Sequence, residues 1–173
     1  MRVRLIKRLY ALVFFASLGG CDAPVEHAAA PPAATPAFYQ SLASDAAVVD
    51  AASARDMISL YRQNNGLGPL ALDETLQAAA SRQAQDMARR GSVDAAARGT
   101  LMTTLAAQGL RKSHAVENVS AGYHTLAEAF SGWRDSAPHN RRMLDPGVTR
   151  MGLATAYARG TKYKVFWALI LTD

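Results

Sequence analysis

Cys21 is the only cysteine of this 173-residue sequence, and what precedes it points to covalent chemistry at its thiol. Four basic residues lie near the start of the chain: Arg2, Arg4, Lys7 and Arg8. A short apolar run follows over residues 9–18, and it is too short for a bilayer core, which needs roughly 20 residues. A basic start, a short apolar run and small residues before a cut site are typical of a secretory signal, which we predict over residues 1–20.

The end of this segment, Leu18-Gly19-Gly20-Cys21, resembles the lipobox of bacterial lipoproteins. In those proteins diacylglycerol is attached to the cysteine thiol, the chain is cut before the cysteine, and the new amine is acylated. The resemblance therefore implies lipidation of Cys21 and anchoring to a membrane, which several acyl chains make stable. Asp22 resembles the enterobacterial signal for retention at the periplasmic face of the inner membrane. The alternative is an ordinary secretion signal that is cut elsewhere.

The basic charge of the sequence comes mostly from this first segment. Removing its four basic residues from the formal net charge of +5 leaves +1. No stripe of lysine and arginine with interleaved aromatic residues remains, so we expect no nucleic-acid partner. Because the single cysteine is assigned to lipid, we expect no disulfide framework.

Residues 21–50 are predicted to be a tether that carries the lipidated cysteine, because they are rich in alanine and proline. Within this stretch, residues 38–50 are ambiguous and fit either a short helix or more linker. A globular pattern begins near Ala51, so we predict a single domain over residues 51–173.

Four helices are predicted in the domain from helical spacing, caps and stop signals. The first contains Met57, Leu60 and Tyr61 and ends at Asn64-Asn65-Gly66. The second is capped by Asp73, buries Leu76, Ala80, Ala84 and Met87, and ends at Gly91. A short third helix covers residues 100–107, and a fourth covers residues 125–135 with Thr125 and Glu128 as a capping box.

Two strands are predicted at the end of the chain, over residues 148–157 and 163–171, with a hairpin turn at residues 159–162. The second strand is apolar on both faces, which is typical of a central strand covered by helices. The predicted fold class is α+β: a three-layer α-β-α sandwich with a mainly antiparallel central sheet.

Several segments, in this order and at this spacing, resemble bacterial CAP (SCP) domains, a superfamily named after cysteine-rich secretory proteins, antigen 5 and pathogenesis-related 1 proteins. Residues 57–91 resemble the first two helices, and residues 117–122 resemble a Glu-Asn-Ile-Ala-x-Gly segment. Residues 133–144 resemble Trp-x-x-Ser-Pro-Gly-His-Arg-x-x-(Ile/Met)-Leu, and residues 150–154 with Phe166-Trp167 match the closing strands. The resemblance implies an α-β-α sandwich with a cleft on one face.

In animal and plant members of this superfamily, the cleft carries two histidines and two acidic residues, which hold a divalent metal in some structures. The resemblance places Glu117 and His139 at two of these four positions. Asp94 stands at or near the position of the first histidine, and Ser136 replaces the second glutamate. We therefore expect Glu117 and His139 to lie within a hydrogen bond or one bridging water of each other.

A tight zinc site needs three or four ligands, and Glu117 with His139 supplies two, so no tight zinc site is expected and weak capture of a divalent metal stays open. For catalysis, a carboxylate beside His139 would suit a general base, but no nucleophile elbow is present. Ser136 fits a helix cap better than a nucleophile. In a purely structural role, Glu117 accepts hydrogen bonds and Asn118 pins a loop. Tyr123 is the candidate for lining the cleft.

These observations predict a non-enzymatic module that binds a lipid, a glycan or a protein of the envelope. The alternative is an envelope hydrolase that acts on a peptide or a glycan with His139 and Glu117. A third possibility is a structural spacer.

Overall fold

The computed structural model describes residues 34–94, 101–107, 109–110 and 114–173 of the chain. The predicted signal peptide, Cys21 and the first part of the predicted tether lie outside these residues. Among the residues described, no helix combines the length and the apolarity that crossing a bilayer requires.

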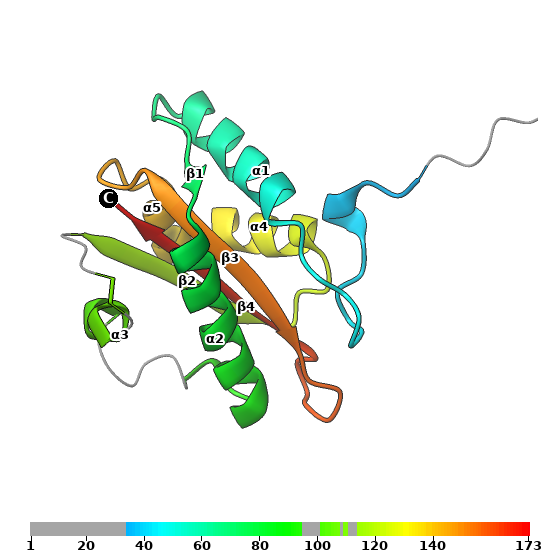
Figure 1. Cartoon of the computed structure of the whole chain (residues 1–173). Helices are drawn as coiled ribbons and strands as arrows, with labels where there is room; N and C mark the ends of the chain where they lie inside the picture. The colour runs from blue at the N-terminus through cyan, green and yellow to red at the C-terminus, as the bar shows by residue number, and fades with distance from the viewer. Residues whose placement is uncertain (1–33, 95–100, 108, 111–113) are drawn as a thin grey trace, which may run out of the picture. The chain divides into compact units, whose positions relative to one another are not determined.

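The described residues form helices around a four-stranded sheet (Figure 1). The helices are η1 (Ala37–Tyr39, a 3-10 turn), α1 (Ala51–Asn64), α2 (Glu74–Arg90), α3 (Leu101–Ala107), α4 (Leu126–Asp135) and α5 (Ala137–Met143). The strands are β1 (Ala71–Leu72), β2 (Ala115–Ala121), β3 (Arg150–Tyr157) and β4 (Val165–Thr172). The sheet has the order β1-β3-β4-β2; β1 pairs with β3 in parallel, and the other pairs are antiparallel.

The sheet separates two apolar cores. On one face, α2 covers β3 and β4 through Leu76, Ala80, Ala84 and Met87, and α3 adds Leu105. On the other face, α1, α4 and α5 cover the sheet around Trp133 and Trp167 (Figure 1). The predicted α+β sandwich with a mainly antiparallel sheet is therefore confirmed, and β4 is buried along its whole length, as expected of a central strand.

The predicted ends of α2 and the predicted start of α4 are confirmed by their caps. The Asp73 side chain accepts hydrogen bonds from the amides of Thr75 and Leu76, and α2 ends at Gly91, which has a φ of 67°. At α4, Thr125 and Glu128 form the predicted capping box. These side chains satisfy amides that the first turn of a helix leaves without partners.

The buried face of α1 differs from the prediction at Leu60. That side chain is 60% exposed, whereas Ala54, Ile58 and Arg62 are buried. Ile58 packs in the core and Arg62 binds carbonyls beneath it, while Met57 and Tyr61 pack against the same core. Of the three residues at the predicted helical spacing, only Leu60 therefore faces solvent.

Packing begins ahead of residue 51, where the sequence placed the start of the domain. Leu42 and Val49 are buried in the core that contains Trp133, and η1 contacts α4. The Leu42 amide also donates to the carbonyl of His124 at 2.7 Å. Residues 38–50, which fitted either a helix or a linker, are therefore part of the folded unit.

Candidate functional site

Strand β2 carries the residues that match the family's Glu-Asn segment, and it was not predicted as a strand because the adjacent polar residues Glu117 and Asn118 interrupt its apolar pattern. Successive side chains of a strand point to opposite faces. Ala115, Val119 and Ala121 pack in the core under α2, so Glu117 belongs to that face. Val116 packs in the opposite core.

Glu117 is bound from α2. Its Oε2 accepts a hydrogen bond of 2.5 Å from Nε2 of Gln83, a residue on the helix. Asp94 lies beyond the end of the same helix in a short turn, where its amide and its carboxylate both meet the hydroxyl of Ser92. Asp94 is exposed, and no hydrogen bond or ion pair joins it to Glu117 within the described residues.

Asn118 points to the other face and is fully buried. Its Nδ2 donates at 3.0 Å to the backbone carbonyl of His139, which ties β2 to α5. Its Oδ1 has no hydrogen-bond partner in the part of the chain that the structure describes. Asn118 therefore pins a helix, where the sequence suggested a loop, and it leaves one buried acceptor free.

His139 lies on α5, and its ring is half-buried. Burial lowers the pKa of His139 below its usual value, and the positive charge of Arg142 lowers it further. The imidazole is therefore neutral at pH 7. Within the described residues, no hydrogen bond or ion pair involves this ring.

The expected meeting of Glu117 and His139 is not found, and this prediction is wrong. Glu117 faces α2, whereas its neighbour Asn118 reaches α5 on the opposite face and contacts the His139 backbone. Glu117 and the His139 backbone therefore lie on opposite faces of the sheet. The physical reason is the alternation of β2: adjacent residues cannot serve the same face, and Asn118 takes the face of His139.

Tyr123 packs against α4. A Cβ atom added at Gly132 would lie 2.0 Å from the Tyr123 hydroxyl, so the ring lies directly over this glycine. The Tyr123 carbonyl accepts a hydrogen bond of 2.9 Å from the indole of Trp167. Tyr123 thus fills space on the face of Trp167, away from Glu117.

Ser136 links α4 to α5 and stands at the first position before α5. Its carbonyl accepts the amide of Asn140 at 2.8 Å, but its hydroxyl makes no cap hydrogen bond. Ser136 therefore stands at the predicted cap position, but only its backbone carbonyl, and not its hydroxyl, bonds to α5.

The residues at the family's cleft positions are not brought together as one ligand set in the part of the chain that the structure describes. Glu117 and His139 lie on opposite faces, and Asp94 makes its contacts with Ser92. No group of three or more histidine, cysteine, aspartate or glutamate side chains lies together in the described ranges.

A buried arginine was missed by the sequence analysis. Arg62, at the end of α1, donates to the carbonyls of Gly68, Met143, Asp145 and Val148, at distances between 2.7 and 3.1 Å. The signal was present, because Arg62 lies one helical turn after Ile58 on the buried face. Burial lowers the pKa of Arg62, and the charge of Asp145 opposes this.

Asp145 connects this arginine to His114. The carboxylate lies 2.8 Å from Nε2 of His114. Burial raises the pKa of Asp145, but hydrogen bonds from His114 and Gly147 and the charges of His114 and Arg62 outweigh it, so the pKa falls below its usual value. The cluster of Arg62, Asp145 and His114 holds the chain between α5 and β3.

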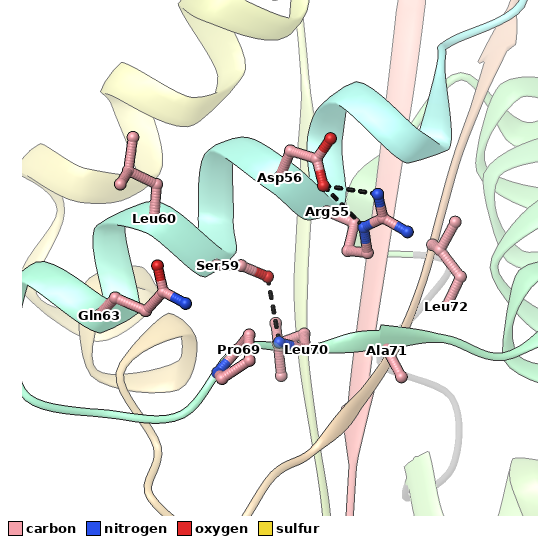
Figure 2. A pocket seen from close by; sticks show the side chains of 9 residues that line it. All are labelled: Arg55, Asp56, Ser59, Leu60, Gln63, Pro69, Leu70, Ala71 and Leu72. Carbon is pink, nitrogen blue, oxygen red and sulfur yellow. Dashed lines mark hydrogen bonds and ion pairs between the residues drawn. The ribbon is translucent and has the colours of Figure 1, made fainter.

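A hollow of about 620 Å³ lies between α1 and the segment around β1 (Figure 2). Leu60 and Leu72 border it with exposed apolar side chains, and Arg55 and Asp56 form an ion pair at its rim. Ser59 closes its floor by accepting the amide of Leu70 at 3.0 Å. None of the predicted site residues lines this hollow.

Comparison with known proteins supports the fold and assigns the family. The family model described as "CAP: Cysteine-rich secretory protein family" matches residues 55–171. The uncharacterized protein YkwD of Bacillus subtilis (strain 168) is 30% identical over 100 residues, which are 57% of this chain and 39% of YkwD. This chain therefore spans well under half of that relative.

Two solved structures are similar in fold. An extracellular SCP-domain protein of Bacillus anthracis str. Ames matches with a TM-score of 0.60 and 24% identity, over 70% of this chain and 39% of that chain. An outer surface protein of Borrelia burgdorferi matches with a TM-score of 0.55 and 15% identity, over 73% of this chain and 97% of that chain. With a family model that covers β1 to β4 and all the helices between them, this chain belongs to the cysteine-rich secretory protein (CAP) family.

Proposed function

We propose that this chain is an exported CAP-domain protein that is anchored to a membrane by lipid on Cys21 and acts as a binding module without turnover. Export is supported by the basic and apolar pattern of residues 1–20 and by the fold relatives, which are described as extracellular or as an outer surface protein. Lipid anchoring is supported by the Leu18-Gly19-Gly20-Cys21 sequence.

The observation that favours binding over hydrolysis is the separation of Glu117 and His139. A general base needs to lie within hydrogen-bond reach of the proton that it takes, and it is usually oriented by a second group. His139 has no carboxylate beside it among the described residues, and Glu117 is bound to Gln83. The same distribution argues against these residues as a shared metal site.

The ligand class that fits this role is a lipid, a glycan or a protein of the cell envelope. The mature protein would work at the membrane surface, at the periplasmic face of the inner membrane if Asp22 acts as a retention signal.

Turnover is tested with the wild-type protein, His139→Ala and Glu117→Gln on peptidoglycan and on peptide libraries. We expect no product above background from any of the three. Hydrolysis by the wild type that both substitutions abolish, at unchanged folding, would establish the hydrolase instead.

Anchoring is tested by mass spectrometry and membrane fractionation of the protein expressed in a bacterial host. We expect acyl chains on a mature terminus at Cys21 and a membrane-bound protein, whereas Cys21→Ser releases it. An unmodified Cys21, or a mature terminus elsewhere, would show an ordinary secretion signal.

A further inference from the structure

Strand β3 has an outer edge that is only partly covered. Strand β1 pairs with it at Arg150 and Met151 alone. The even-numbered residues of β3 bond towards β4, as the bond from the Ala158 amide to the Lys164 carbonyl shows. The odd-numbered residues therefore turn their backbone N–H and C=O groups to the outer edge.

The first outer position beyond β1 is closed by a side chain. Gln77 of α2 donates from Nε2 to the Leu153 carbonyl at 2.6 Å and accepts from the Leu153 amide at Oε1 at 3.0 Å. A carboxamide has the same donor and acceptor as a peptide group, so Gln77 occupies the place of a neighbouring strand. The edge can thus accept a peptide group in this geometry.

The next two outer positions have no such cover. The backbone groups of Thr155 and Tyr157 point to the same edge as those of Leu153. In the described part of the chain, no loop, cap or side-chain hydrogen bond reaches these groups, and β1 ends before them. Exposed edge groups of this kind are a template for pairing with another strand.

A groove follows this edge. One hollow of about 480 Å³ lies between α2 and residues 47–49, with Ala154 and Thr155 at its floor. A second, of about 320 Å³, continues along Ala156, Tyr157 and Ala158, and Gln85 lines both. On the rim, the Val48 side chain is 84% exposed.

We propose that this groove binds an extended segment of another envelope polypeptide, which adds a strand to β3 by pairing with the backbone of Thr155 and Tyr157. Main-chain hydrogen bonds would supply affinity in this mode of recognition, and alternate side chains would supply specificity. This proposal identifies a peptide as the ligand of the binding module proposed above, and it rests on that proposed function.

The side chains that line the groove indicate which residues the bound peptide segment would carry. Side chains that turn towards α2 meet Ala78, Ser81 and Ala88, so small residues fit there. Side chains that turn the other way meet Val48, which favours apolar residues. Glu74 lies at one end and Arg89, which is paired with Asp86, at the other. These opposite charges favour a basic residue at the first end and an acidic residue at the second.

The test begins with a phage-displayed library of peptides of about nine residues, a typical strand length, selected on the full chain in detergent. The enriched peptide is then added to ¹⁵N-labelled protein. We expect hydrogen exchange at the amides of Thr155 and Tyr157 to slow about tenfold or more, because these amides become bonded. N-methylation of the peptide amides that face β3 should abolish binding, and N-methylation of the alternate amides should not.

Two substitutions in the groove and two controls complete the design. Thr155→Pro removes the backbone N–H of residue 155 from the edge, and an edge strand tolerates proline. Ser81→Arg fills the groove without changing the strand. Each should weaken the peptide by at least about tenfold. His139→Ala and Leu60→Arg, the latter in the hollow beside β1, should leave affinity unchanged.

The outcomes separate this site from the general binding role. Failure to enrich any peptide on the wild type over Ser81→Arg overturns the groove while leaving lipid anchoring and binding of lipid or glycan untouched. Loss of peptide binding in Leu60→Arg or His139→Ala, but not in Ser81→Arg, places the ligand elsewhere and overturns it as well. Concentration-dependent dimers that Ser81→Arg abolishes would overturn the envelope partner and assign the edge to a second copy of this chain.

Discussion

The two faces of the sheet are held by different means. On the face of α2, small side chains such as Ala80 and Ala84 meet Ala154 and Ala168, and the helix approaches the strand closely. On the face of α4, Trp133 and Trp167 meet edge to face, with 6.1 Å between their ring centroids. Each indole N–H there donates to an acceptor, the Ser120 hydroxyl or the Tyr123 carbonyl.

Each face is therefore sensitive to a different kind of substitution. Close contact between small residues tolerates little added volume. Large residues with buried N–H donors, and a buried arginine, depend on acceptors for those donors. We therefore expect added atoms to damage the α2 face most, and lost hydrogen bonds to damage the opposite face most.

Arg62→Met tests the face of α4 and is expected to have the largest effect. Methionine fills similar space but leaves the carbonyls of Gly68, Met143, Asp145 and Val148 without their donor. We expect the free energy of unfolding to fall by about 3–5 kcal/mol in urea denaturation. Arg55→Met, which breaks an exposed pair on the same helix, should change it by less than about 1 kcal/mol. Equal effects of the two would contradict the role of Arg62.

Gly152→Ala tests the α2 face. A Cβ atom at this position would lie 2.2 Å from the backbone carbonyl carbon of Leu76, and no rotamer change can relieve a clash with backbone. We expect a loss of about 3 kcal/mol, measured in the same way. Gly160→Ala is the control, because nothing lies within 4 Å of its Cβ position. Near-identical stabilities of the two variants would show that α2 moves aside easily.

Asp73→Asn gives a smaller, pH-dependent effect on the α2 face. The Thr75 hydroxyl lowers the pKa of Asp73 to about 2 against the opposing effect of burial, and backbone amides and Arg150 add to this. Because the folded pKa lies below the unfolded value of 3.8, this stabilisation is present above about pH 4 and is lost as the pH falls towards 2.

Asparagine also caps helices but does not titrate here. We expect the wild type to exceed Asp73→Asn by about 1 kcal/mol at about pH 7 and to lose this advantage by about pH 2, in thermal melts across this range. A constant difference between the two proteins would show that the carboxylate is not the titrating group.

His139→Gln should have the smallest effect, on the opposite face. Burial and Arg142 lower the folded pKa of His139 below 6.5, so the unfolded chain binds the proton more tightly. The wild type should therefore lose stability as the pH falls below about 6.5, by less than about 0.5 kcal/mol relative to the variant. A wild type that gains stability relative to the variant over this range would show that the ring has an acidic partner in solution.

The sequence predicted best what is decided locally. The Asp73 cap, the Gly91 stop and the Thr125–Glu128 box each depend on residues within one turn of a helix, and all are found. The strand β4 was recognisable because a continuous apolar run needs cover on both faces.

What depends on the pairing of distant segments was not predictable in the same way. Strand β2 was missed because Glu117 and Asn118 interrupt its apolar pattern, and its partner β4 lies far along the chain. Since the strand was missed, its alternation was missed too, and with it the separation of Glu117 from His139. Arg62 was overlooked because a charged residue is seldom fully buried.

The packing of Leu42 and Val49 has a mechanical consequence. A pull on the N-terminal chain would reach the folded part first at η1 and at the bond between the Leu42 amide and the His124 carbonyl, before it reached α1. The ion pair of Asp45 with Arg159 and the burial of Val49 would bear the force next. These contacts would break under tension before the sheet is strained, so this segment would protect the domain if the chain is anchored at Cys21 as proposed.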